Sequence, residues 1–125
     1  MPTLKQNLLA EFIGSMFLVV VAIASTILPY NVLNAGLPLT ILINALAVAL
    51  VLFALIETFA SISGAHFNPA VTLALLAAKD IKPRVAGYYI AAQFAGGVLG
   101  LVIAHAMFYD TVSKLIVISD IVRTP

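Results

Sequence analysis

The chain has 125 residues, of which 63% are hydrophobic and 9% charged, and its mean hydropathy is +1.17. A soluble domain needs far more charge than this, so the composition predicts a membrane protein. The formal net charge of +1 indicates neither a nucleic-acid partner nor an acidic one, and the sequence contains no cysteine, which excludes disulfides and thiolate metal sites.

The first apolar segment runs over residues 8–28, close to the roughly 20 residues that a helix needs to cross a bilayer. Lys5 and the apolar run after it loosely fit a cleaved signal peptide. Glu11 inside the run and the further apolar segments argue against cleavage. We therefore expect a retained transmembrane helix, with Glu11 about one turn inside the membrane.

The second apolar segment, residues 38–60, leads into a stretch over residues 61–78 that interrupts the apolar pattern. Asn68 is a favourable N-cap and Pro69 stands at the first helical position, so a short helix is predicted from there. A turn followed by so short a helix cannot span a bilayer. Its exposed backbone is tolerated at membrane depth only against protein or a water-filled cavity, which predicts a re-entrant loop and half-helix.

A charged cluster closes the half-helix, a third apolar segment covers residues 85–109, and residues 110–125 read as a connector, a loop or short interfacial segment. The predicted fold is therefore all-α and integral to the membrane, with three transmembrane helices and one re-entrant half-helix. If the re-entrant segment enters and leaves on one face, four basic residues lie on that side and two on the other, which favours a cytoplasmic N-terminus. The four are Lys5, Lys79, Lys82 and Arg84, and the two are Lys114 and Arg123.

Residues 63–72, Ser-Gly-Ala-His-Phe-Asn-Pro-Ala-Val-Thr, resemble the first Asn-Pro-Ala signature of the aquaporin and aquaglyceroporin family. Residues 10–15 resemble the buried-glutamate motif of the family's first helix. The resemblance covers residues 8–109 and implies half of the family's right-handed bundle, in the plasma (inner) membrane and in a tetramer-like homo-oligomer. A family pore lies between two inverted repeats. With one copy of the signature here, a second half is expected from another copy, another chain or further sequence.

The resemblance also implies a pore lining. The Asn68 side chain caps its own helix and presents an NH₂ group to passing oxygen atoms, while the half-helix dipole opposes cations. Val48 aligns with the constriction wall, where many members carry an aromatic residue, and a valine leaves a wider, more apolar passage. The alternative is that Val48 is an ordinary apolar residue facing lipid or core. The implied pore-lining residues are Val48, Gly64, Ala65, His66, Asn68, Pro69 and Ala70.

Glu11 needs partners, because an ionised carboxylate inside a membrane costs several kcal/mol. Either it accepts hydrogen bonds from backbone N–H groups of the re-entrant loop, or it reaches the interface. Gly14 favours the first reading, since a glycine lets another backbone approach closely. By resemblance, His66 and Gln93 also support the loop.

Two features stand outside the signature. Glu57 lies about 180° around its helix from Val48, so both cannot face one pore. Three alternatives stay open for Glu57: it hydrogen-bonds to the following loop, it faces a neighbouring subunit, or it is reached by water at the end of the helix. Small residues in the third segment predict close helix crossing. The helix-packing residues are Gly14, Ala92, Gly96 and Gly100.

No nucleophile–base pair, metal-ligand cluster or phosphate loop is found in the sequence, so we expect no enzyme, no metal site and no cofactor. The expected function is a half-module of an aquaporin-like passive channel for water or small uncharged solutes. Its partners would be the lipid bilayer and a second half-channel. The alternative is a non-conducting membrane scaffold or a degenerate channel remnant.

Overall fold

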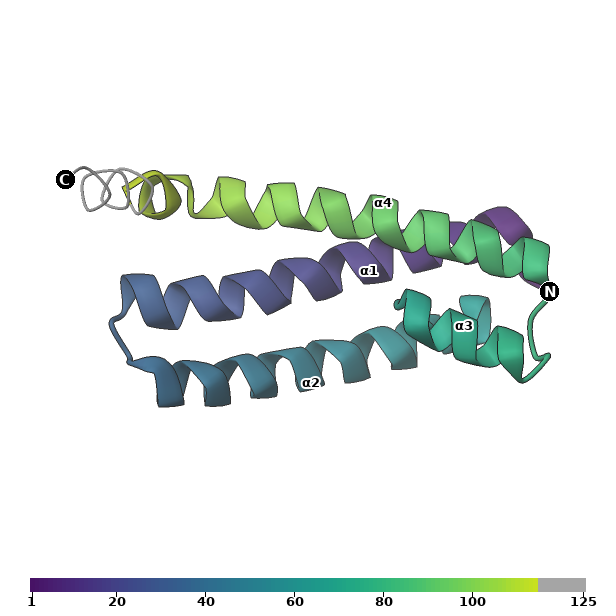
Figure 1. Ribbon diagram of the computed structural model, residues 1–125, viewed down its shortest axis with the longest axis horizontal. Coiled ribbons are helices and arrows are strands. Elements are labelled where there is room, and N and C mark those ends of the chain that lie inside the picture. The colour runs from purple at the N-terminus through teal and green to yellow at the C-terminus, as the bar shows by residue number, and fades with distance from the viewer. Residues whose placement is uncertain (115–125) are drawn as a thin grey trace.

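The computed structural model describes residues 1–114, and over that range it consists of helices and turns (Figure 1). The long helices are α1 (Leu4–Ile27), which continues into the π-helical turn η1 (Leu28–Val32), α2 (Leu37–Ser63) and α4 (Pro83–Met107). A fourth helix, α3 (Pro69–Ala77), has nine residues. All three long helices have the length and apolar composition to cross a membrane, which confirms the predicted all-α fold with three spans.

α1 begins at Leu4, earlier than the predicted residue 8, because its N-terminus is capped. The Thr3 hydroxyl accepts a hydrogen bond from the Gln6 N–H at 3.3 Å, and the Gln6 side chain accepts one from the Thr3 N–H at 2.8 Å. This reciprocal pair is a capping box, which satisfies two otherwise unpaired donors. The apolar pattern could not show it, because the capping residues are polar.

The segment predicted as a turn after residue 28 is partly helical, as far as Val32. Pro29 has no N–H group, so the α-helical bond at that position is lost. The Leu33 N–H donates to the Leu28 carbonyl at 3.0 Å, five residues back, and the Pro29 carbonyl accepts the Ala35 N–H at 2.9 Å, which makes this turn a π-helix.

α2 also extends further than predicted, through residues 61–63. It stops at Gly64, whose φ of +86° is a left-handed conformation that glycine adopts without strain. α4 begins at Pro83 rather than 85, because proline suits the first helical position. It ends at Met107, short of the predicted 109. Residues 109–114 are helical, and the rest of the predicted connector, residues 115–125 with Arg123, lies outside the described residues.

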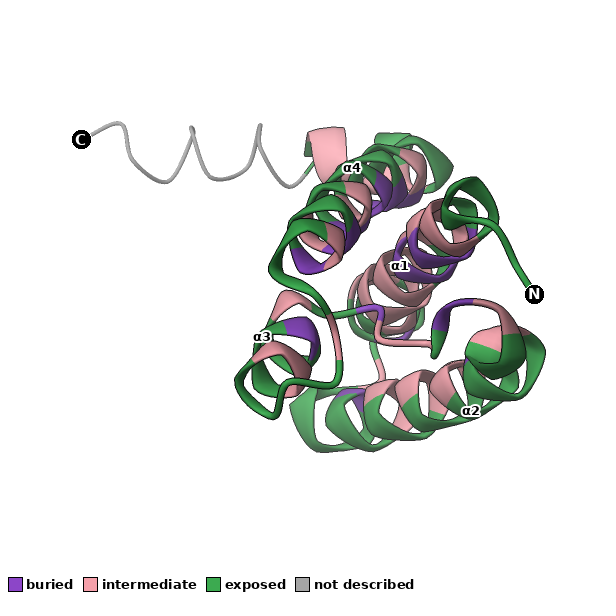
Figure 2. Ribbon diagram, turned by 90° about the vertical axis from the view of Figure 1, so that its right-hand side faces the viewer, coloured by how far each residue is buried: buried purple, intermediate pink, exposed green. Residues whose placement is uncertain are grey.

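α1 packs between α2 and α4, and α3 packs against α4 at one end of the bundle (Figure 2). The α1–α4 contact depends on two glycines. A Cβ atom at Gly96 would lie 2.2 Å from the Phe12 carbonyl oxygen, and one at Gly100 would lie 2.5 Å from that of Met16. The backbones of these two helices therefore meet directly, which a larger residue would prevent. Ala92, on the same row, is half-buried.

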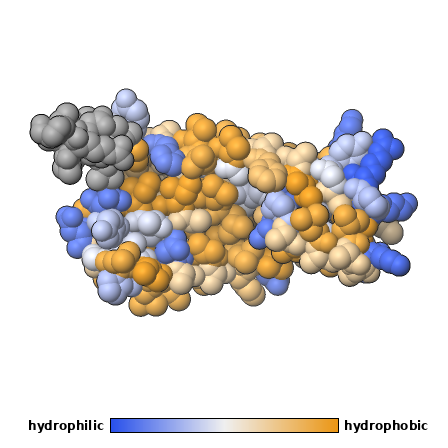
Figure 3. All heavy atoms as spheres, viewed as in Figure 1, coloured by the Kyte–Doolittle hydropathy of each residue, from blue (hydrophilic) through white to orange (hydrophobic). Residues whose placement is uncertain are grey.

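The outer surface is largely apolar, with polar residues gathered toward the two ends of the bundle (Figure 3). Large apolar side chains such as Leu50 and Phe53 on α2 and Val98 on α4 are more than half exposed. A soluble protein would bury such a surface, whereas a bilayer or a partner chain covers it in a membrane protein.

Candidate functional site: the re-entrant loop and half-helix

α3 is far too short to cross a bilayer. Nine residues rise by roughly 13 Å, against about 30 Å of hydrocarbon. Both α2 and α3 run toward the end of the bundle that holds the N-terminus, so the loop between them, residues 64–68, turns the chain back before α3 begins (Figure 1).

The start of α3 has the cap that the sequence predicts. Asn68 has extended backbone angles, and its side-chain oxygen accepts the Ala70 N–H at 2.8 Å, with Pro69 at the first helical position. The Asn68 side chain is exposed, and its NH₂ group makes no hydrogen bond to the described residues. The oxygen is thus occupied by the helix, while the two amide hydrogens face outward.

Glu11 is fully buried, and its carboxylate accepts four hydrogen bonds. One oxygen accepts the Ser63 hydroxyl at 2.7 Å and the His66 N–H at 3.0 Å. The other accepts the Phe67 N–H at 2.7 Å and the Gln93 amide at 2.8 Å. The acid on α1 therefore joins the end of α2, the loop and α4. It does not reach the interface, the alternative that the sequence left open.

A second polar centre is the Thr72 hydroxyl, which is buried at the first turn of α3. The Gln93 amide donates to it at 2.9 Å, and His66 Nδ1 lies 2.9 Å away. The hydroxyl in turn donates to the Asn68 carbonyl at 3.3 Å. All three bonds form together if His66 carries its proton on Nδ1, because the hydroxyl has one hydrogen to give.

The loop backbone is strained. Ala65 and Phe67 both have φ of +53°, a left-handed conformation that residues with a Cβ rarely adopt. Such strain persists only where the surroundings fix it. Here the N–H groups of His66 and Phe67 both donate to Glu11, which holds this part of the loop in place.

The Phe67 ring fixes the other side of the loop. It packs so closely on Gly14 that a Cβ there would lie 2.0 Å from the ring, and it meets Phe59 edge to face at 6.0 Å. Gly14 was expected to admit a neighbouring backbone, but it admits an aromatic ring. The loop main chain meets α1 at Glu11 and Ser15, and at Gly14 it is the Phe67 side chain that packs against the helix.

The carbonyl oxygens of Gly64, Ala65 and His66 accept no hydrogen bond from residues 1–114. Three consecutive unpaired carbonyls at membrane depth are costly unless water or protein faces them. If the loop lies at membrane depth, as the sequence predicts, these three oxygens require an aqueous or protein neighbour.

A groove of about 330 Å³ lies beside the half-helix. Its lining residues come from α1, α3 and α4 and are Val19, Pro69, Gln93, Phe94, Gly97, Val98 and Leu101. The structure thus brings Pro69 and Gln93 to one groove. Val48 is half-buried on α2 and is not among its lining residues. Glu57 is exposed on α2 and makes no hydrogen bond to the loop within the described residues.

Sequence reasoning missed several hydroxyl groups. The Tyr89 hydroxyl donates to the carbonyl of Ser63 at 2.8 Å, satisfying an oxygen that the end of α2 leaves unpaired. Ser15 lies 3.4 Å from the Phe67 carbonyl. A signal was available, since Ser15 and Tyr89 each stand one helical turn from a residue already singled out, Glu11 and Gln93. Within residues 1–114 there is no cluster of three or more potential metal ligands.

The fold and the site define an integral membrane protein with a re-entrant half-helix. The family model described as "Major intrinsic protein" matches residues 1–122, and the chain belongs to this family. It is 34% identical to the aquaglyceroporin AqpS of Rhizobium meliloti over 84% of its own length. It is 37% identical to the lens fiber major intrinsic protein of Lithobates pipiens over 78% of its length, and 35% identical to aquaporin-2 of Dasypus novemcinctus over 81%.

The chain spans 45% of the length of the Rhizobium relative and 35% of that of the Lithobates relative, but 88% of the Dasypus sequence. The helices and the half-helix described above therefore correspond to half or less of the first two relatives, as expected for a single repeat.

Proposed function

We propose that this chain is one half of an aquaporin-like passive channel for water or small uncharged solutes, with the pore completed by a second half. The observation that carries the proposal is the set of unpaired polar groups at the start of the half-helix and in the loop before it. The outward NH₂ group of Asn68 supplies donors, and the carbonyls of Gly64, Ala65 and His66 supply acceptors, so a solute can exchange hydrogen bonds with them as it passes.

The surface beside the half-helix supports the need for a second half. The apolar groove reaches the half-helix at Pro69, and Phe94 and Val98 on the groove are highly exposed. A second half packed here would cover this surface and close the far wall of the pore. It would come from another copy of the chain, a separate chain or further sequence, in a tetramer-like homo-oligomer by resemblance to the family.

The orientation proposed is a cytoplasmic N-terminus in the plasma (inner) membrane. The basic residues Lys5, Lys79, Lys82 and Arg84 support it, because loops rich in lysine and arginine stay on the cytoplasmic side. Val48 supports a passage wider than a water-sized one. By the family resemblance, many members carry an aromatic residue at this position, and valine fills less space.

Stopped-flow light scattering tests the proposal. The chain, affinity-purified from its own membranes so that any partner accompanies it, is reconstituted into vesicles, and osmotic water and glycerol permeability are measured. We expect permeability above that of empty vesicles. Asn68→Asp keeps a good N-cap but removes the donor, so permeability should fall about tenfold, the factor that corresponds to one hydrogen bond of about 1.4 kcal/mol.

Asn34→Asp is the matched control, because the same chemical change is then made at an exposed residue of the α1–α2 turn. It should leave permeability unchanged. Water and glycerol permeabilities equal to those of empty vesicles would overturn the proposal and favour a non-conducting scaffold.

A further inference from the structure

The end of the bundle that holds the N-terminus has a groove of about 410 Å³ between α1 and α4. Leu4 and Leu8 stand one turn apart on α1, and Val85 and Tyr88 stand three residues apart on α4, so two apolar walls face each other. Arg84 is the charged residue among those that line it. The groove is therefore apolar along its walls and cationic at its rim.

Arg84 is held in a defined orientation. Its Nε–H donates to the Tyr88 hydroxyl at 3.2 Å, and its guanidinium carbon lies 5.7 Å from the centre of the Tyr88 ring. Within residues 1–114 the Arg84 guanidinium makes only this hydrogen bond. The N–H groups of its two terminal nitrogens are therefore free to bind another ligand. A guanidinium oriented in this way suits two parallel bonds to a phosphate group.

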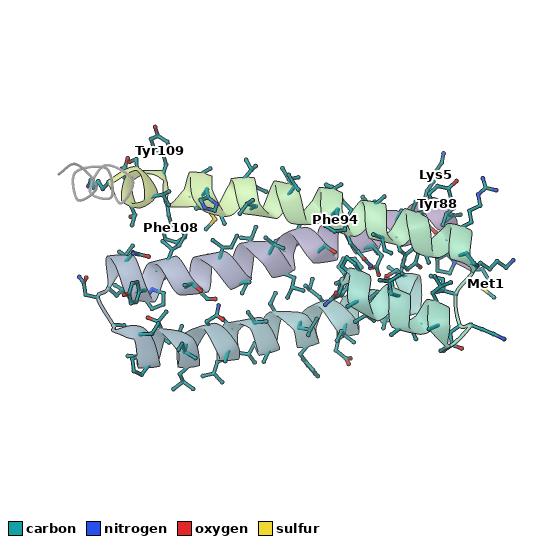
Figure 4. All side chains as sticks on the ribbon, viewed as in Figure 1. Met1, Lys5, Tyr88, Phe94, Phe108 and Tyr109 are labelled. Carbon is teal, nitrogen blue, oxygen red and sulfur yellow. The ribbon has the colours of Figure 1, made fainter. Side chains whose placement is uncertain are left out.

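The surroundings add positive charge. Lys5 lies on α1 at the same end of the bundle as Tyr88 (Figure 4), and Lys82 immediately precedes α4. α1 and α4, which line the groove, begin here with the positive ends of their dipoles, whereas α2 and α3, which run toward this end, contribute no lining residue. Of the nearby carboxylates, Asp80 lies in the charged turn, and Glu11 is buried with its oxygens already occupied.

We propose that this groove binds an anionic phospholipid from the leaflet on the N-terminal side. The phosphate would contact Arg84 and Lys5, and an acyl chain would lie along Leu8 and Val85. The apolar walls favour a lipid over a soluble phosphate, which would gain nothing from them. A tyrosine beside basic residues is also typical of the boundary between lipid and water. The binding does not depend on whether the chain conducts solutes.

The test is native mass spectrometry of the full chain in mild detergent, with dioleoyl phosphatidylglycerol or dioleoyl phosphatidylcholine added. The wild type should retain phosphatidylglycerol preferentially. Arg84→Gln and Lys5→Gln should each reduce that retention about fivefold, the factor for one basic residue near an anionic lipid. Lys114→Gln removes the same charge at the opposite end and should have no effect.

A second variant separates the groove from charge alone. Val85→Trp keeps every charge but fills the groove, and it should also reduce retention of phosphatidylglycerol. Millimolar inorganic phosphate should not displace the lipid. The proposal is overturned if both lipids are retained equally, if Lys114→Gln weakens binding as much as Arg84→Gln, if Val85→Trp has no effect, or if phosphate alone displaces the lipid.

Discussion

At the scale of single residues, the decisive feature is a buried carboxylate whose two oxygens are both fully used as hydrogen-bond acceptors. Glu11 accepts four hydrogen bonds, two from loop N–H groups and two from side chains on α2 and α4. Bonds to a charged acceptor are stronger than neutral ones. They fix a loop whose backbone angles at Ala65 and Phe67 are unfavourable on their own.

Glu11→Gln tests this feature. The amide has one oxygen and places an NH₂ group among four donors, so at least one buried donor loses its acceptor. We expect a loss of about 3 kcal/mol in the free energy of unfolding, measured by denaturant titration in detergent. Glu57→Gln is the control, because Glu57 is exposed, and it should change stability little. Equal effects of the two substitutions would show that the loop does not depend on Glu11.

Glu11 was predictable because a charge stands out in an apolar run, and Asn68 because it forms a helix start with Pro69. The Ser63 hydroxyl was not, since a serine hydroxyl in a membrane helix commonly bonds its own backbone and gives no sign of a distant partner. Tyr89 could be found from its spacing to Gln93, but the spacing does not show that its hydroxyl meets the Ser63 carbonyl. Close approach at Gly14 was expected from its lack of a side chain, but the sequence could not show that the neighbour is a phenylalanine ring.

At the scale of helices, α4 sits on α1 because its glycines remove the side chains that would separate them. The four-residue spacing of Ala92, Gly96 and Gly100 predicted a close helix crossing. It could not identify which backbone atoms the glycines face. The helix ends were the weakest predictions, because they depend on caps and not on apolar pattern. The capping box of Thr3 and Gln6 starts α1 earlier than hydropathy indicates, and Pro83 does the same for α4.

Two glycines of α4 provide a matched pair. A Cβ at Gly96 would meet the Phe12 carbonyl oxygen at 2.2 Å, whereas one at Gly87 meets nothing within 4 Å. Gly96→Ala should therefore destabilise the protein by about 2 kcal/mol through overpacking. Gly87→Ala should stabilise it by up to about 1 kcal/mol, the difference in helix propensity. Thermal unfolding in detergent measures both, and a Gly96→Ala protein as stable as the wild type would contradict the direct backbone contact.

At the scale of the whole molecule, three spanning helices hold one half-helix that leaves one exposed face, at the amide of Asn68. A single chain leaves that face open, with an apolar groove at Pro69. The sequence predicted the helix order, while the place of Val48 at the constriction wall stays a prediction, since the described chain shows it only as half-buried on α2. The described chain would supply one wall of the proposed pore, and the proposed second half would supply the opposite wall.

The most direct test of the account uses the absence of cysteine from the sequence. Single cysteines at Ala65 and Leu50 are exposed to a charged, membrane-impermeant methanethiosulfonate reagent in sealed vesicles. We predict that Ala65→Cys, on the loop, is modified and that Leu50→Cys, on the lipid-facing surface, is not. Protection of both positions would contradict the claim that the re-entrant segment faces an aqueous path.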